Sequence, residues 1–123
     1  MDASKPEPHP IPNSNPHIAD WVMADVAAAG NVYLSQSLAS QILTDLKARK
    51  KKGFESYGTA LQAHNGRNAL MDLYQEVTDG VQYARQVQEE GVTPAIQPIY
   101  ANLFAMMIRV KQLLNEQEGS SAS

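Results

Sequence analysis

The sequence predicts an all-α fold, a helical bundle of about four helices. Apolar residues recur at intervals of three and four along several segments, which is the spacing of an amphipathic helix. No segment shows a sustained alternation of apolar and polar residues, so strands are not expected. Glycine and proline stand where the helical pattern stops and divide the chain into separate helices. With 123 residues, the chain is long enough for one domain with a modest core.

The two ends of the chain are predicted to lie outside this bundle. Residues 1–17 contain five prolines, Pro6, Pro8, Pro10, Pro12 and Pro16. Proline at that density removes backbone donors and blocks helix and sheet, so an extended or disordered arm is expected. The arm is either a plain tail or a strap across a partner subunit or a site. Residues 119–123 are predicted to be a flexible tail, which leaves residues 18–118 as the helical domain.

Two helices are expected in the first half of the chain, over about 18–29 and 35–52. Gly30 ends the first helix, Ser35 is a suitable N-cap for the second, and Gly53 lies just past its end. Cations are favoured at a helix C-terminus. The basic run there is therefore either a solvated helix end or a nucleic-acid patch, and it consists of Lys47, Arg49, Lys50, Lys51 and Lys52.

Two further helices are expected over about 67–90 and 96–117. In the fourth helix, apolar residues occupy most of the circumference, whereas a surface helix normally carries a single apolar stripe. The fourth helix is therefore expected to lie at a subunit interface or, alternatively, at the centre of the core. The inward face of the third helix is predicted to carry Leu70, Leu73, Val77, Val81 and Ala84.

Bulk composition argues against several classes of protein. A net charge of -3 gives no whole-chain field that would attract nucleic acid or an anionic membrane, so neither is expected as a partner. The chain has no cysteine, which excludes a disulfide framework and thiolate metal sites. The sequence has no signal-peptide pattern at its start and no apolar stretch long enough to span a bilayer, so a soluble cytoplasmic protein is expected.

Three carboxylates, Asp72, Glu76 and Asp79, form a ladder in the third helix. Steps of four and three residues return to the same side of a helix, so the three acids fall within about 60° of arc, opposite the apolar face. Like charges stacked in this way repel one another, and no Lys or Arg shares the face. A hard divalent cation, which prefers oxygen ligands, would offset the repulsion. The alternative is a solvated face of an amphipathic helix.

The second helix contains a further acid, Asp45, which falls on or beside the predicted inward stripe. A carboxylate that faces a core is costly unless it is paired or bound to a metal. Asp45 is expected either to form a local ion pair with Arg49 or to be a fourth metal ligand that faces the ladder across the groove between the helices. In the second case Arg49 would bind a phosphate with its forked donors. Metal-binding acids beside phosphate-binding bases indicate metal-assisted phosphate chemistry.

The connection between the second and third helices, residues 53–67, is long for a helix–helix loop, and such loops are often functional. Arg67 stands at the predicted start of the third helix, where backbone N–H groups favour anions. Tyr57, Asn65 and Arg67 are therefore candidates to cover a nucleotide, or else they hold the loop in place. Trp21 would stack on a base, or else it is a core aromatic residue.

The same residues resemble a known family. The segment Glu76-Val-Thr-Asp79 resembles the ExxD half-motif of the MazG-like all-α nucleoside triphosphate pyrophosphohydrolases. The longer string from Tyr57 to Glu76, YGTALQAHNGRNALMDLYQE, is similar to the pattern YGTxLQxxNGRxALxDxYQE of a phage and actinobacterial branch with MazZ-like members. The resemblance spans about residues 21–90, most of the predicted helical part.

The resemblance implies a helical bundle that assembles as a homodimer or tetramer. It also implies hydrolysis of a (deoxy)nucleoside triphosphate to the monophosphate and pyrophosphate with Mg²⁺ or Mn²⁺. MazZ-like members supply deoxyguanylate, which makes dGTP or GTP the leading candidate substrate, in phage nucleotide metabolism within the host cytoplasm. A non-catalytic nucleotide-binding or regulatory helical oligomer is the alternative.

The resemblance and the residue patterns together assign roles to individual side chains, and Glu76 or Asp72 is expected to act as the catalytic base. The expected metal ligands are Asp45, Asp72, Glu76 and Asp79. The expected phosphate-binding residues are Arg49, Lys52, Arg67 and Tyr83, and the expected nucleotide-binding residues are Tyr57, Asn65 and Trp21. The sequence departs from the family in that the ExxE half-motif of the preceding helix is absent, with only Asp45 available there, and Asn68 stands where relatives often place Asp.

Overall fold

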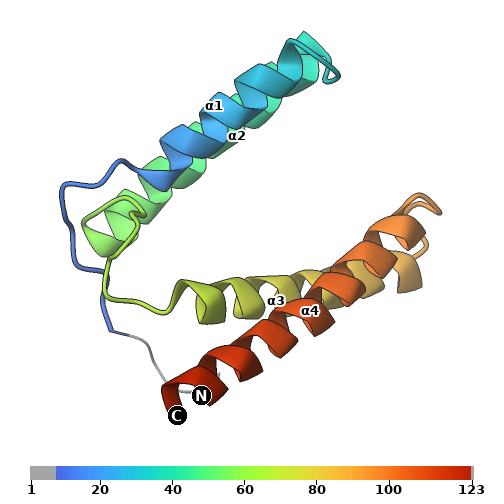
Figure 1. Cartoon of the computed structure of the whole chain (residues 1–123). Coiled ribbons are helices and arrows are strands. Elements are labelled where there is room, and N and C mark those ends of the chain that lie inside the picture. The colour runs from blue at the N-terminus through green and yellow to red at the C-terminus, as the bar shows by residue number, and fades with distance from the viewer. Residues whose placement is uncertain (1–7, 123) are drawn as a thin grey trace. The chain divides into compact units, whose positions relative to one another are not determined.

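The computed structural model describes residues 8–122, with side chains as far as Gly119. It confirms the all-α prediction, because these residues form four helices and no strand (Figure 1). None of the helices in this described part is both long and apolar enough to cross a membrane. The helices are α1 (Ile18–Gly30), α2 (Gln36–Tyr57), α3 (Ala69–Glu89) and α4 (Ile96–Ala122).

The chain divides into two compact units at the junction between Arg67 and Asn68. One unit, Glu7–Arg67, holds α1 and α2, and Asn68–Ser123 of the other unit holds α3 and α4. Within each unit the two consecutive helices run antiparallel and pack side by side as a hairpin (Figure 1).

The α1–α2 hairpin begins its second helix as predicted and ends it later. The side-chain oxygen of Ser35 accepts a hydrogen bond from the backbone N–H of Leu38, which confirms Ser35 as the N-cap. The predicted end at Gly53 is wrong, because α2 continues through Gly53 to Tyr57. The C-cap is instead Gly58, which takes the left-handed conformation with φ 73°. A helix interior accepts a glycine at a cost of about 1 kcal/mol, whereas this type of helix end requires a left-handed residue.

The α3–α4 hairpin also differs from the prediction at its ends. The side chain of Asn68 accepts a hydrogen bond from the N–H of Met71 at 3.1 Å and caps α3. Arg67 therefore precedes the cap, and the prediction that it opens the helix is wrong. At the other end, the backbone of α4 continues past the predicted end at Gln117 as far as Ala122. Residues 119–122, which were predicted to be a flexible tail, thus extend this helix, and Ser123 lies outside the described residues.

The core of the α3–α4 hairpin is narrow. Met71 and Val81 of α3 are buried, as are Val110 and Leu114 of α4. Leu73, which was predicted to face inward, is 49% exposed. The reason is that α4 packs on the side of α3 that carries Met71 and Val81, roughly 100° around the helix from Leu73. The apolar arc of α3 is wider than the surface that one neighbouring helix covers.

Candidate functional site

The carboxylate ladder lies on the outer side of α3. Because α4 packs against the side of Met71 and Val81, the positions of the ladder residues are about 150° around the helix from that contact. Glu76 and Asp79 are exposed and Asp72 is half-buried. Tyr83, one turn beyond Asp79 on the same side, is also exposed. The structure therefore places the four predicted α3 site residues along one accessible edge of the hairpin.

The negative charge of this edge is not offset by the described cations of the same hairpin. Arg85 pairs with Glu89 at 2.8 Å, and Lys111 lies over the ring of Tyr74, with its Nζ 5.3 Å from the centroid. Arg109 lies 3.8 Å from Glu116. These three are the only Lys or Arg residues between Asn68 and the end of the chain.

Two of the ladder carboxylates have no protein partner in the described part of the chain. Neither Glu76 nor Asp79 forms an ion pair or a side-chain hydrogen bond with any residue from 8 to 119. No side chain within residues 8–119 therefore relieves the repulsion between them, which solvent or a bound cation would reduce.

The chemistry of the ladder suits a hard divalent cation. All of its donors are carboxylate oxygens, the ligands that Mg²⁺ and Mn²⁺ prefer. Successive rungs are separated by about one turn, with about 5–6 Å between their Cβ atoms. Among the residues that the structure describes, no three His, Asp or Glu side chains gather into a group that could hold a metal ion. The ladder alone thus supplies donors of the right kind in a row rather than in a closed cage.

The candidate residues of α2 are all on its surface. Asp45, Arg49 and Lys52 are exposed, whereas Ala39, on the side that packs against α1, is buried. Asp45, which was predicted on or beside the inward stripe, is exposed in this hairpin, so no cost of burying its carboxylate arises. The alternative of an Asp45–Arg49 ion pair is also not seen between these two described side chains.

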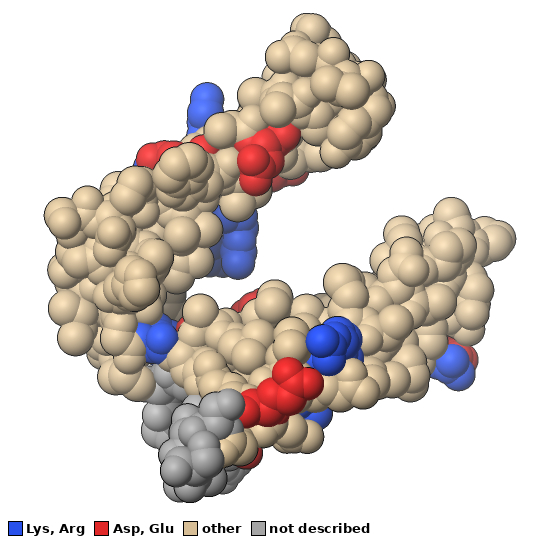
Figure 2. Space-filling view, in the orientation of Figure 1, with Lys and Arg blue, Asp and Glu red and all other residues tan. Residues whose placement is uncertain are grey.

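The basic run of α2 is spread around the helix. Lys50 is partly covered and its Nζ binds Asp20 of α1 at 2.9 Å. The other members of the run, Lys47, Arg49, Lys51 and Lys52, are exposed, and Lys and Arg side chains project from opposite sides of the α1–α2 hairpin in Figure 2. Because α2 continues to Tyr57, the run does not lie in the last turn of the helix as predicted. It is mainly a solvated part of α2 that offers cations on several sides.

The loop after α2 is held by the proline-rich arm of the same chain. Gln62 is only 6% exposed and is the centre of this contact. Its side-chain amide donates to the carbonyl oxygens of Asn13 and Asn15 at 2.8 and 2.7 Å, and its oxygen accepts the N–H of Asn13 at 3.1 Å. The side-chain amide of Asn13 in turn donates to the carbonyl oxygens of Ala63 and His64.

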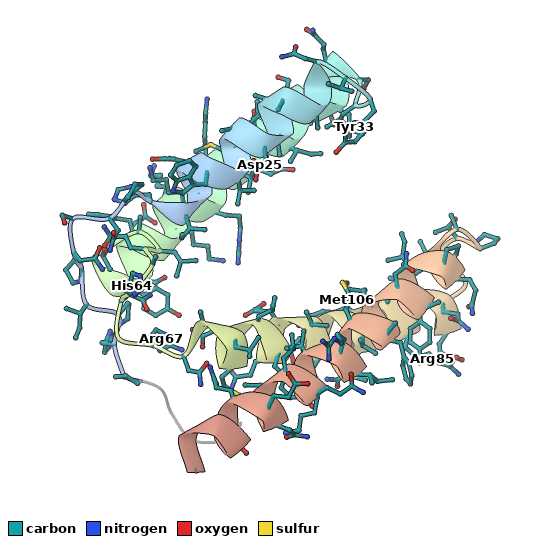
Figure 3. All side chains as sticks on the ribbon, viewed as in Figure 1. Asp25, Tyr33, His64, Arg67, Arg85 and Met106 are labelled. Atoms are coloured by element: carbon teal, nitrogen blue, oxygen red, sulfur yellow. The ribbon has the colours of Figure 1, made fainter. Side chains whose placement is uncertain are left out.

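The predicted nucleotide-binding residues of this loop take part in the same contact. The carbonyl of Asn65, a buried residue, accepts the N–H of Ile11 at 2.8 Å. The guanidinium of Arg67 donates to the carbonyl of Pro8 at 2.7 Å, and the ring of Tyr57 meets that of His9 edge to face, with centroids 6.3 Å apart. Figure 3 labels Arg67 and His64 in this loop, beside the extended segment.

Residues 8–17 are thus a strap across a loop of their own chain. The described part of the arm is therefore not a plain tail, and it contacts Tyr57, Asn65 and Arg67, the residues that the sequence predicts to cover a nucleotide. Residues 1–7 of the predicted arm lie outside the described residues. The sequence signal that was missed is the pair of asparagines, Asn13 and Asn15, whose side chains can bond to backbone in an extended segment. The remaining candidate, Trp21, is 61% exposed on α1, so the alternative that it is a core residue is wrong.

Comparisons with known proteins add no relative. No family model, curated protein or solved structure matches the chain.

Proposed function

We propose that the chain is a MazG-like nucleoside triphosphate pyrophosphohydrolase. It hydrolyses a (deoxy)nucleoside triphosphate to the monophosphate and pyrophosphate with Mg²⁺ or Mn²⁺. The observation that carries the proposal is the ladder of Asp72, Glu76 and Asp79 on the outer edge of α3, in which two carboxylates have no protein partner among the described residues. Its supporting pattern in the sequence is the string from Tyr57 to Glu76 that resembles the family.

In this proposal the ladder residues hold the metal, and Asp45 is a further ligand. A bound divalent metal supplies positive charge that stabilises the phosphates in the transition state. Glu76 or Asp72 positions the water that attacks the α-phosphorus and accepts its proton. The bond from the α-phosphorus to the bridging oxygen breaks, and pyrophosphate leaves.

The phosphate-binding role falls to Arg49, Lys52, Arg67 and Tyr83, all of which carry donors suited to phosphate oxygens. Arg49 and Lys52 are exposed and without an ion pair within the described residues, so their donors are accessible. The nucleoside would contact Trp21, Tyr57 and Asn65. The proposed substrate is dGTP or GTP, in phage nucleotide metabolism within the host cytoplasm, and the proposed assembly is a homodimer or homotetramer.

A panel of nucleotides tests the reaction. The purified protein is incubated with each dNTP and with GTP, with Mg²⁺ or Mn²⁺ and with EDTA, and the products are separated by ion-exchange chromatography. We expect monophosphate and pyrophosphate in equal amounts, only with metal, and fastest from dGTP or GTP. Release of orthophosphate, or no turnover of any nucleotide, would count against a pyrophosphohydrolase.

Conservative variants test the ladder. Glu76→Gln and Asp79→Asn remove the charge of one rung and keep its shape. Each should lower the rate at least about 100-fold, because transition-state charge is stabilised chiefly by such groups. Asp25→Asn, which changes an exposed acid of α1, is the matched control and should leave the rate unchanged. Circular dichroism verifies that helicity is retained, and full activity in both ladder variants would remove the ladder from the mechanism.

A non-catalytic nucleotide-binding or regulatory protein is the second candidate. It is favoured by the arm, which already engages Tyr57, Asn65 and Arg67. Calorimetric titration with dGTP and metal distinguishes the two. Binding without turnover, unaffected by Glu76→Gln, supports the binding protein.

A further inference from the structure

Helix α3 carries a second apolar stripe beside the one that faces α4. Its residues follow one another at intervals of three and four, which is the heptad spacing of a helix that packs lengthwise against another helix. Leu73 in the middle of this stripe is 49% exposed, although Ala84 further along is buried. The stripe consists of Leu70, Leu73, Val77, Gly80, Ala84 and Val87.

Helix α4 has the same double pattern. One heptad stripe faces α3 and is buried or half-buried along its length: Ile96, Tyr100, Leu103, Met107, Val110 and Leu114. A second stripe lies beside it and shares two of these residues: Ile99, Leu103, Met106, Val110 and Leu113. In the second stripe Ile99 is 52% and Met106 is 46% exposed, and Met106 projects outward from the ribbon in Figure 3.

The two second stripes lie on the same face of the hairpin. In each helix the second stripe is displaced by about 80° from the contact line, toward the same direction of rotation along the chain. Because the helices are antiparallel, equal displacements of this kind bring both stripes to one side. A contact agrees with this placement, since a Cβ at Gly80 would lie 3.8 Å from a methyl carbon of Leu103. We call this surface the open face.

The open face has no charged residue, which sets it apart from the other hairpin. Each stripe that flanks the contact line of α2 holds two charges. One consists of Leu38, Ile42, Asp45 and Arg49, and the other of Leu43, Lys47, Lys50 and Phe54. Burying either stripe against the open face would leave charges in an apolar contact without partners, which is costly. A second copy of the open face, by contrast, can cover the first without burying a charged side chain.

Side-chain size points to the same occupant. Gly80 and Ala84 place two small side chains together in the α3 stripe, whereas Ile99 and Met106 are large, exposed side chains of the α4 stripe. In a twofold pairing, the α4 side of each copy can lie on the α3 side of the other, because each surface meets its own complement. Two hairpins then provide four helices, enough to enclose a core that one hairpin leaves half open.

We propose that two copies of this chain pair through the open face, so that α3 and α4 of each copy form a four-helix bundle with those of the other. The open face is then the contact surface of the homo-oligomer that is part of the proposed function. It does not depend on the reaction, and its test does not measure activity.

The test compares two variants of equal exposure on α4. Met106 belongs to the open face, and Ile108, which is likewise 46% exposed, lies about 160° around the helix from it. Molar mass is measured by sedimentation equilibrium from about 1 to 100 µM. We expect the unaltered chain and Ile108→Glu to be dimers or larger even assemblies. Met106→Glu should dissociate to monomers at concentrations at least about 100-fold higher, because it buries a charge.

Cross-linking gives a second measurement that does not depend on a charged variant. The chain has no cysteine, so Met106→Cys and Ile108→Cys each carry a single thiol. A short bismaleimide should join two copies of Met106→Cys and leave Ile108→Cys uncoupled. A monomer at every concentration overturns the proposal. So does equal dissociation or equal cross-linking of the two positions. A monomer whose Met106→Cys thiol is protected from maleimide also overturns it and indicates that α1–α2 covers the open face.

Discussion

At the scale of single residues, Gly53 inside α2 and Gly58 at its C-cap differ in backbone conformation. Gly53 lies inside the helix, and a Cβ added there would meet nothing within 4 Å. Gly58 has equally open surroundings, but its φ of 73° is left-handed. The same substitution should therefore have opposite effects at the two sites.

Gly53→Ala should raise the free energy of unfolding by about 1 kcal/mol, because alanine restricts the unfolded chain and suits a helix interior. Gly58→Ala should lower it by about 1 kcal/mol, because the left-handed conformation strains a residue with a Cβ. Urea unfolding followed by circular dichroism measures both. Destabilisation by Gly53→Ala would mean that α2 is interrupted at that residue.

At the scale of elements, the strap of residues 8–17 and the loop after α2 stabilise each other through polar contacts. Gln62 satisfies one donor and two acceptors of the strap. Buried groups that lose their partner retain the cost of desolvation. The strap therefore depends on a few specific hydrogen bonds more than on apolar packing.

Gln62→Ala should lower the free energy of unfolding by about 1–3 kcal/mol, because it leaves the N–H of Asn13 and two carbonyls without partners. The control is Gln41→Ala, since the Gln41 side chain is exposed and bonds to Ser37 of its own helix in the same unit. Urea unfolding followed by the fluorescence of Trp21, the single tryptophan and part of the same unit, reports the change. Equal stability of both variants would show that the strap adds nothing.

At the scale of the whole molecule, the open face links stability to association. If the folded chain pairs through α3 and α4, unfolding separates the copies, and melting must depend on protein concentration.

A 100-fold increase in concentration, from about 1 to 100 µM, should raise the Tm by about 5 °C or more, since mass action adds about 2.7 kcal/mol. The measurement is thermal unfolding by circular dichroism at matched path lengths. Met106→Glu should melt at a Tm that does not change over this range, whereas Ile108→Glu should follow the unaltered chain. An unchanged Tm for the unaltered chain would contradict association through this face.

Prediction from the sequence succeeded where interactions are local. Ser35 caps α2 as expected, and each helix was located because its apolar spacing and end signals lie within a few residues of one another. Prediction failed at Gly53, since one glycine does not distinguish a helix interior from a helix end. It did not establish that Asp45 is exposed, because the side of α2 that packs against α1 depends on the partner helix. The sequence left open whether Tyr57, Asn65 and Arg67 cover a nucleotide or hold the loop in place. Their contacts are with the strap, which is distant in the sequence, so local patterns could not reveal them.

The sequence by itself determined that this protein is helical, where its helices lie and that Asp72, Glu76 and Asp79 share one side of α3. These properties follow from the periodicity of a single helix, which needs no neighbour. Only the tertiary structure decided which of two adjacent apolar stripes α4 covers, and that residues 8–17 bind the loop around Gln62. The physical reason is that stripes about 80° apart satisfy the same local pattern, so only the packing of distant segments selects between them.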